Sequence, residues 1–177
     1  RAGTQTNYNL TGSAITMDGT GITAVGGSGN AATVFANGEA SINSNQNNTT
    51  NVTLTVNSNI IMLNTNLGIG GASSNANARN NVVIGGNITN GDSATRQLNF
   101  RGGVGTVAYN TQVTGTIGAT LGAGGGGITI QNLITGSSPV NLQGNIGAAT
   151  GTGAAITISN TATGTGAFNI SGAMVYV

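Results

Sequence analysis

The chain has 177 residues, of which 4% are charged and 3% are aromatic, and it contains 32 Gly, one Pro, no Cys and no His. Its formal net charge of +1 gives no positive field for nucleic acid, whose phosphates need clustered Lys and Arg, so no nucleic-acid partner is expected. The longest apolar runs, such as 60–63 and 82–84, are far shorter than the roughly 20 residues of a membrane-spanning helix. We therefore expect no membrane insertion.

The residue pattern predicts an all-β chain. Hydrophobic residues make up 37% of the sequence and stand in short alternating runs that a disordered segment lacks. Thr, Asn and Gly are poor helix formers, and apolar residues do not recur at a 3.6-residue spacing. Alternating strands are expected at 15–17, 52–56, 98–100, 128–130, 140–142, 156–158 and 168–170.

The first half of the chain repeats loosely. Residues 9–27 have the residue types of the later repeats at a less regular spacing, and 51–60 can be aligned one period before 80–89. The polar tract 41–51 and the Gly- and Asn-rich tract 70–81 predict two protruding loops.

From residue 80 onward the repeat is clear, with a period of about 29 residues. Segments 80–89, 110–119, 139–148 and 167–175 bring Gly86, Gly115, Gly144 and Gly172 into register, and a second motif recurs at 67–71, 97–102, 127–132 and 155–160. Each repeat is thus a multi-strand unit that must stack on its neighbours to bury its apolar face. Gly and Asn accept the positive φ of a sharp turn, which predicts corners at Gly19, Gly102, Asn132, Gly144, Asn160 and Gly172.

This spacing favours a parallel β-solenoid of roughly six coils over a β-sandwich with strand-complemented ends. In a solenoid, residues one repeat apart lie above one another. We therefore expect interior columns of Phe100, Ile130 and Ile158 and of Val113, Leu142 and Ile170, with Asn110, Asn141 and Asn169 as an amide ladder at a turn. The chain is interpreted as one domain over 1–177, less regular over 1–79 and clearest over 80–177.

Several runs resemble the passenger repeats of filamentous-haemagglutinin-type exoproteins and autotransporters of bacteria with an outer membrane. They are NVTLTVNSNIIMLN (51–64), GNITNG (86–91), GGITIQNLITG (126–136) and GAAITISNTATGTGAFNISG (153–172). The resemblance implies a right-handed parallel β-helix that is secreted, is displayed on or shed from the cell surface, and serves adhesion, biofilm or fibre building.

The sequence offers little for catalysis. Its three acids are Asp18, Glu39 and Asp92, whereas polysaccharide-cleaving β-helices need clustered carboxylates. Asp18 and Glu39 could share one face as a functional pair, although two unrelated surface turns are the simpler interpretation. Asp92 is expected to cap a turn or pair with Arg96. Without His or Cys there is no nucleophile–base pair, so we expect no enzyme activity and no cofactor, beyond a structural Ca²⁺ held by Asp18 and backbone carbonyls.

Two surface features are further candidates for binding. Arg79, Arg96 and Arg101 fall within about one repeat and could form a patch for glycans or a protein partner, or be solvated loop charges. Thr129 and Thr157 would stack as in ice-binding solenoids, but Asn99 is expected at the equivalent site of the preceding coil, which interrupts a Thr column.

The ends of the solenoid suggest self-assembly. A solenoid leaves unpaired N–H and C=O groups at both ends unless charge, Pro or a helix caps them, and neither end of this sequence shows such a cap. We expect head-to-tail polymerisation in which the apolar run at one end docks near the strand-like residues at the other. These residues are Ala173, Met174, Val175, Tyr176 and Val177 at the C-terminal end and Tyr8, Asn9 and Leu10 at the N-terminal end.

The expected function is a self-assembling subunit of an extracellular surface fibre or matrix. The alternative is an adhesin passenger fragment of a longer solenoid that binds glycan or host protein through the tracts 41–51 and 70–81. The lack of Cys is compatible with secretion, and Arg1 in place of Met suggests processed material.

Overall fold

The computed structural model describes residues 7–18, 22–26, 39–46, 52–73, 80–91, 93–102, 110–118, 126–134, 139–147, 155–161 and 165–175. Within these ranges all regular secondary structure is β-strand, and the strands form three six-stranded sheets. Every described pairing between strands is parallel.

We name the sheets A, B and C after the order in which the chain first enters them. Sheet A contains β1 (Asn7–Leu10), β5 (Val52–Val56), β8 (Asn80–Ile84), β11 (Asn110–Val113), β14 (Val140–Leu142) and β17 (Phe168–Ile170). Sheet B contains β2 (Ile15–Met17), β6 (Ile60–Met62), β9 (Ile88–Asn90), β12 (Ile117–Gly118), β15 (Ile146–Gly147) and β18 (Met174–Val175). Sheet C contains β3 (Ile22–Gly26), β4 (Glu39–Gln46), β7 (Asn66–Ser73), β10 (Arg96–Gly102), β13 (Ile128–Asn132) and β16 (Ile156–Asn160).

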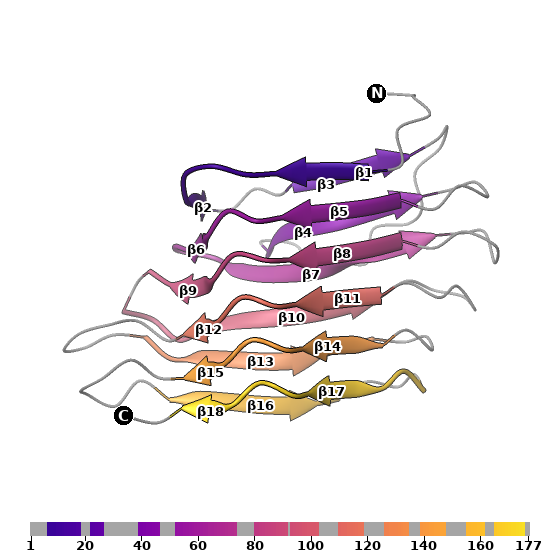
Figure 1. Ribbon diagram of the computed structural model, residues 1–177. Helices are drawn as coiled ribbons and strands as arrows, with labels where there is room; N and C mark the ends of the chain where they lie inside the picture. Colours follow the sequence, from indigo (N-terminus) through magenta and orange to yellow (C-terminus); the bar gives the residue numbers. More distant parts are fainter. Residues whose placement is uncertain are drawn as a thin grey trace.

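The chain passes from sheet A to sheet B to sheet C and back again, and each such passage forms one coil of a parallel β-solenoid (Figure 1). In Figure 1 the chain runs leftward across the front in sheet A and rightward across the back in sheet C while it descends, which is right-handed winding. The predicted fold class is confirmed. The β-sandwich alternative is wrong, because hairpin-connected sandwich strands would pair antiparallel.

One strand lies outside this regular order. β4 pairs with β7 and therefore supplies the sheet C strand of the first coil. β3, which precedes β4 in the sequence, pairs with the opposite side of β4 and forms the N-terminal edge of the sheet. This extra strand explains why the repeat spacing is loose before residue 51.

The two predicted loops are wrong in part. Residues 41–46 belong to β4, residues 70–73 to β7 and residues 80–81 to β8; the rest of the two tracts, 47–51 and 74–79, lies outside the described residues. Their polarity suggested exposure, yet Asn43 and Ser44 are buried in β4. These two residues are consecutive and face opposite sides of the strand, so buried polar residues on both faces interrupt the alternating apolar signal, and the sequence pattern indicated a loop.

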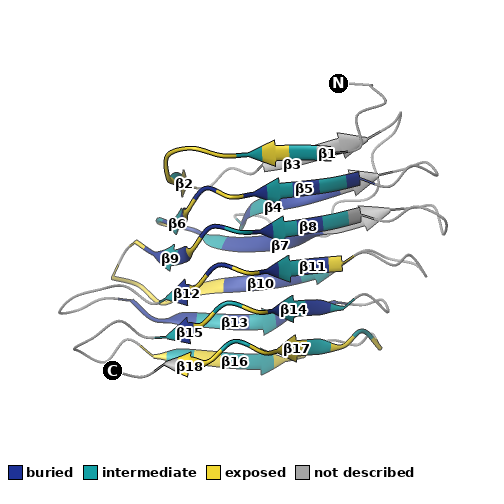
Figure 2. Cartoon of the chain, viewed as in Figure 1, coloured by how far each residue is buried: buried dark blue, intermediate teal, exposed yellow. Residues whose placement is uncertain are grey.

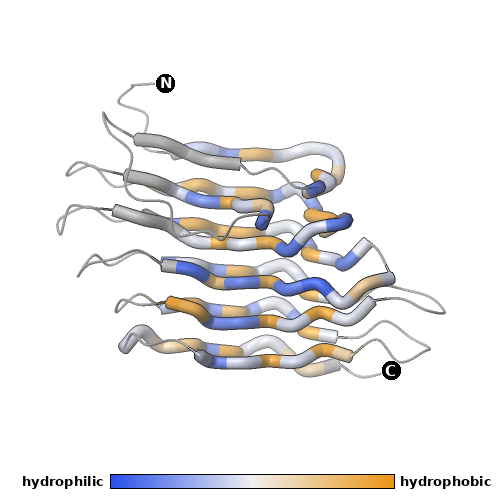
Figure 3. Tube along the Cα trace, turned by 180° about the vertical axis from the view of Figure 1, so that it is seen from behind, coloured by the Kyte–Doolittle hydropathy of each residue, from blue (hydrophilic) through white to orange (hydrophobic). Residues whose placement is uncertain are grey.

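The core consists of apolar columns that run through the coils, and apolar and polar residues alternate along the described strands (Figure 3). The predicted column of Val113, Leu142 and Ile170 is confirmed. It continues through Ile84 and Val56 to Leu10.

The other predicted column is wrong by two positions. Ile130 and Ile158 do pair, but the residue that precedes them is Leu98, and Phe100 pairs instead with Asn132. A shift of two residues keeps every side chain on the same face of its strand, so the alternating pattern does not distinguish the two registers.

The glycines in register form the corner between sheets A and B. A Cβ on Gly115, Gly144 or Gly172 would overlap the carbonyl oxygen of the glycine one coil earlier, and on Gly86 it would overlap that of Ser58. Close approach of the backbones therefore requires glycine here. The predicted reason was a positive φ, but among the described glycines only Gly12 has one, at 125°.

The other predicted corner residues lie at strand ends. Gly102, Asn132 and Asn160 are the last residues of β10, β13 and β16, and Gly19 lies outside the described residues.

Both predicted surface ladders exist in part. The Asn141 Nδ2 donates to the Asn110 Oδ1 at 3.0 Å, and the Asn169 Nδ2 donates to the Asn141 Oδ1 at 2.9 Å. This amide ladder lies on the strands of sheet A rather than at a turn. Its predicted register is wrong by two positions at Asn110, because Asn141 pairs with Gln112 and Asn110 pairs with Asn81. Thr129 does pair with Thr157, but the residue that precedes them is Gln97 and not Asn99.

Candidate functional site

Two parts of the molecule hold the candidate residues, and the first is the pair of solenoid ends. The N-terminal end presents the edges of β1, β2 and β3, and the C-terminal end presents those of β16, β17 and β18. Among the described residues no strand pairs with the outer side of these edges. The N–H and C=O groups along such an edge are a template for another strand.

The C-terminal end is apolar and partly open. Ile170 in β17 is 38% exposed and Met174 in β18 is 45% exposed, whereas Leu142 and Ile146, which precede them in their columns, are fully buried. Figure 2 shows the same change from buried strands in the middle coils to exposed positions in the last coil. In the last coil, the residues that end the two apolar columns are therefore only partly buried.

The N-terminal end carries the first members of the same columns. Tyr8, Leu10 and Ile15 are partly buried and pack against the core. Leu10 begins the column that ends at Ile170, and Ile15 begins the one that ends at Met174.

The assembly residues predicted from the sequence belong to two different sheets. Tyr8, Asn9 and Leu10 lie in β1 of sheet A, whereas Met174 and Val175 form β18 of sheet B. Ala173 precedes β18, and Tyr176 and Val177 lie outside the described residues. The strands at the complementary edges, β17 and β2, were predicted as strands at 168–170 and 15–17, but they were not included among the predicted assembly residues.

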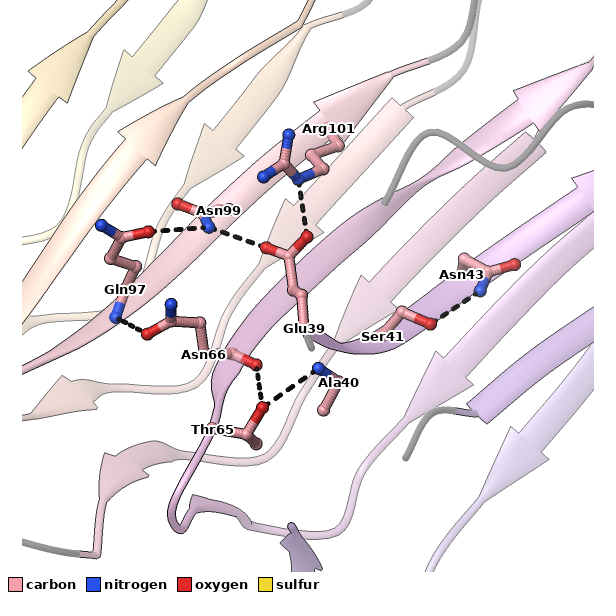
Figure 4. A network of polar contacts seen from close by, with 9 residues as sticks. All are labelled: Glu39, Ala40, Ser41, Asn43, Thr65, Asn66, Gln97, Asn99 and Arg101. Atoms are coloured by element: carbon pink, nitrogen blue, oxygen red, sulfur yellow. Dashed lines mark hydrogen bonds and ion pairs between the residues drawn. The ribbon is translucent and has the colours of Figure 1, made fainter. Parts of the chain in front are cut away.

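The second candidate is a polar cluster on the outer face of sheet C (Figure 4). The Glu39 carboxylate accepts hydrogen bonds from the Asn99 Nδ2 and from the Arg101 Nε, both at 2.7 Å. The Glu39 side chain is 3% exposed and that of Arg101 is 21% exposed. Residues about 60 positions apart in the sequence are thus joined by a largely buried ion pair.

The glycines of β7 make this contact reachable. β7 lies between β4 and β10, and its positions beside Asn99 and Arg101 are Gly68 and Gly70. Because these residues have no side chain, the Glu39 side chain extends across β7 to reach the next strand. The backbone N–H of Gln97 on β10 is likewise bound, at 2.9 Å, by the Oδ1 of Asn66 on β7.

Within the described ranges, the structure does not bring together the residue groups that the sequence analysis considered, namely the pair of Asp18 and Glu39 and the patch of three arginines. Glu39 is held by Arg101 and Asn99, whereas Asp18 is an exposed residue that follows β2. Arg96 and Arg101 both lie in β10, but an odd number of positions apart, so they face opposite sides of the sheet. Arg79 and Asp92 lie outside the described residues.

Within the described part of the chain, no three His, Cys, Asp or Glu residues lie together as a metal-binding group. A search of the same residues for a helix long and apolar enough to cross a membrane found none. Comparison of the sequence and structure with protein-family models, curated proteins and solved structures found no match.

Proposed function

We propose that this chain is a structural protein that assembles head to tail into a fibre or matrix outside the cell. The observation that carries this proposal is the pair of solenoid ends: one end exposes Ile170 and Met174, and the other carries the first members of their columns, Leu10 and Ile15. Joining the two ends would therefore reproduce the packing that successive coils already have within the chain.

Edge geometry supports open-ended growth. Within the described residues, the outer edges at both ends pair with no further strand, and a copy that adds its β1 and β2 edges to the β17 and β18 edges of another extends two sheets at once. The two surfaces of such a contact are different, so the contact is heterologous and produces a filament when the rotation does not close.

Composition is compatible with a structural role outside the cell. The net charge of +1 and the absence of Cys and His suit a weakly charged, redox-insensitive structural material better than a catalyst. The Glu39 carboxylate is held by Arg101 and Asn99, which fits a structural role for this acid.

Electron microscopy and sedimentation of the purified 177-residue chain test the proposal. We expect filaments whose amount rises with protein concentration. Ile170→Lys should place a charge on the exposed end of an apolar column and reduce the sedimenting fraction by about tenfold. Thr116→Lys, at an exposed position away from the ends, is the matched control and should leave assembly unchanged.

Circular dichroism of both variants must retain the β-strand spectrum of the parent chain, so that lost assembly is not lost folding. Isolated short rods at every concentration would contradict the proposal. They would favour the alternative, an adhesin fragment that displays binding surfaces on its sides.

One observation favours that alternative. The outer face of sheet A carries uncharged amide side chains joined from coil to coil, namely Asn110, Gln112, Asn141, Gln143 and Asn169. Amides both donate and accept hydrogen bonds, as the hydroxyls of a neutral glycan require. Binding of the monomeric chain to a panel of neutral glycans, lost on combined Gln112→Ala and Gln143→Ala substitution, would support it.

A further inference from the structure

The first and last coils share a residue pattern. Residues 8–12 read YNLTG and residues 168–172 read FNISG, so both begin with an aromatic residue, continue with Asn and an aliphatic residue, and end with a hydroxyl residue and Gly. The coils between them begin the corresponding segment with Leu54, Val82, Thr111 or Val140. An aromatic residue in this column therefore marks the two ends.

The register of sheet A makes these segments structurally equivalent. Successive pairings along the sheet place Tyr8 in one column with Phe168, Asn9 in one column with Asn169, and Leu10 in one column with Ile170. A strand that followed β17 in the same register would therefore present the residues of β1 at the same positions.

We propose that a second copy of the chain docks with its β1 in register on β17 and its β2 on β18, which rests on the proposed function and specifies its interface. Phe168 then lies over Tyr8 of the second copy, and Ile170 lies over Leu10. In sheet B, Met174 lies over Ile15 of the second copy, because these residues begin and end one column.

The amide contacts of sheet A can continue across this junction. Within the chain, the later coil donates in two of them, from Asn169 Nδ2 to Asn141 Oδ1 at 2.9 Å and from Asn57 Nδ2 to Asn9 Oδ1 at 3.2 Å, whereas Gln112 Nε2 donates to Gln143 Oε1 of the following coil. At the junction, Asn9 of the second copy and Asn169 lie in one column, and because an amide both donates and accepts, they can form a hydrogen bond in either direction.

Sheet C contributes little to this junction. Following the columns through the sheet, Ile22 of β3 corresponds to Asn160, the last residue of β16. The rest of β3 lies beyond the end of β16 along the strand direction. Sheets A and B therefore determine the register.

Disulfide trapping tests the register, because the sequence has no Cys. Parallel neighbours in register have Cα atoms about 4.8 Å apart, which lies within the range that a disulfide spans. We expect a mixture of Asn9→Cys and Asn169→Cys chains to form covalent dimers on mild oxidation. Each variant is also oxidised alone, and Asn9→Cys is mixed with Ala173→Cys to probe docking of the C-terminal run on β1.

The mixture of Asn9→Cys with Asn169→Cys should give about tenfold more covalent dimer than any other combination. Dominant cross-linking of Asn9→Cys alone, or with Ala173→Cys, would overturn the register while leaving assembly intact. Filaments of the parent chain without cross-links in any mixture would overturn it as well. Absence of filaments from the parent chain would overturn both the proposed function and this interface.

Discussion

Sheets A and C each contain six strands, but they hold the register between coils by different means. Sheet A has an inner apolar column that runs from Leu10 to Ile170 through all six coils. The last four coils add a glycine corner, and the last three add amide contacts on the outer face. Sheet C has an extra strand, β3, and depends on a contact between Glu39 and Arg101, 62 residues apart.

The difference shows how local and distant interactions specify a solenoid. In sheet A, every coil carries its own register signal, so a change in one coil affects the contact with its immediate neighbours. In sheet C, the Glu39 contact crosses β7 and joins β4 to β10. Its loss should affect three strands together.

The largest effect is expected at the glycine corner. Gly144→Val places a side chain where the Gly115 carbonyl oxygen lies, and backbone atoms cannot move aside as a flexible side chain does. We expect a loss of about 3 kcal/mol or more in the free energy of unfolding. Chemical denaturation followed by circular dichroism measures it.

Gly118→Ala is the matched control for the corner. A Cβ on Gly118 meets the Gly147 carbonyl oxygen at 3.6 Å, an ordinary contact. This variant should stay within about 0.5 kcal/mol of the parent chain. Equal destabilisation by the two substitutions would show that glycine is not needed at the corner for close approach.

The next effect is expected in sheet C. Glu39→Ala removes the acceptor for the Arg101 Nε and the Asn99 Nδ2 and leaves a partly buried cation unpaired. We expect a loss of about 2 kcal/mol, below the value for a fully buried pair because Arg101 retains some exposure. Thermal or chemical unfolding measures it, with Asp18→Ala, at an exposed acid, as the control.

A double variant sharpens this prediction. Glu39→Ala combined with Arg101→Ala should cost less than the sum of the two single changes, because no unpaired charge remains. Strict additivity would mean that the ion pair does not couple β4 to β10.

A gain in stability is expected inside sheet A. Thr111 is fully buried, and its Oγ1 has no hydrogen-bond partner. Its column neighbours are Val82 and Val140, so Thr111→Val should raise the free energy of unfolding by about 1 kcal/mol. Thr116→Val, at an exposed position, should give no gain in stability. An equal gain at Thr116 would mean that the higher β-propensity of Val, and not removal of the buried hydroxyl, stabilises the Thr111→Val variant.

The sequence predicted sheet A better than sheet C because the register of sheet A is set by local signals that repeat in the sequence. The glycines at 86, 115, 144 and 172 and the column of Val113, Leu142 and Ile170 recur at a fixed period, and each is a local signal. In sheet C the apolar column could be shifted by two residues without changing its pattern, so Phe100 was placed over Ile130 although it pairs with Asn132.

The candidate sites show the same contrast between features with a local sequence signal and features without one. Tyr8–Leu10 lies at an end of the solenoid, as expected from its strand-like pattern. The partner of Glu39 was not predictable, because a residue that reaches across a strand leaves no periodic trace. The glycines at 68 and 70 are the single local indication, since a strand without outward side chains leaves room for a neighbour's long side chain.

The smallest effect is expected on the outer face of sheet A. Asn141 donates to Asn110 and accepts from Asn169, but these amides compete with water, so Asn141→Ala should cost only about 0.5–1 kcal/mol. Chemical denaturation measures the loss, and Gln131→Ala, at a partly exposed position of sheet C, is the control. If Asn141→Ala were as costly as Glu39→Ala, the amide ladder would be a main determinant of the register in sheet A, and the glycine corner would act alongside it rather than dominate.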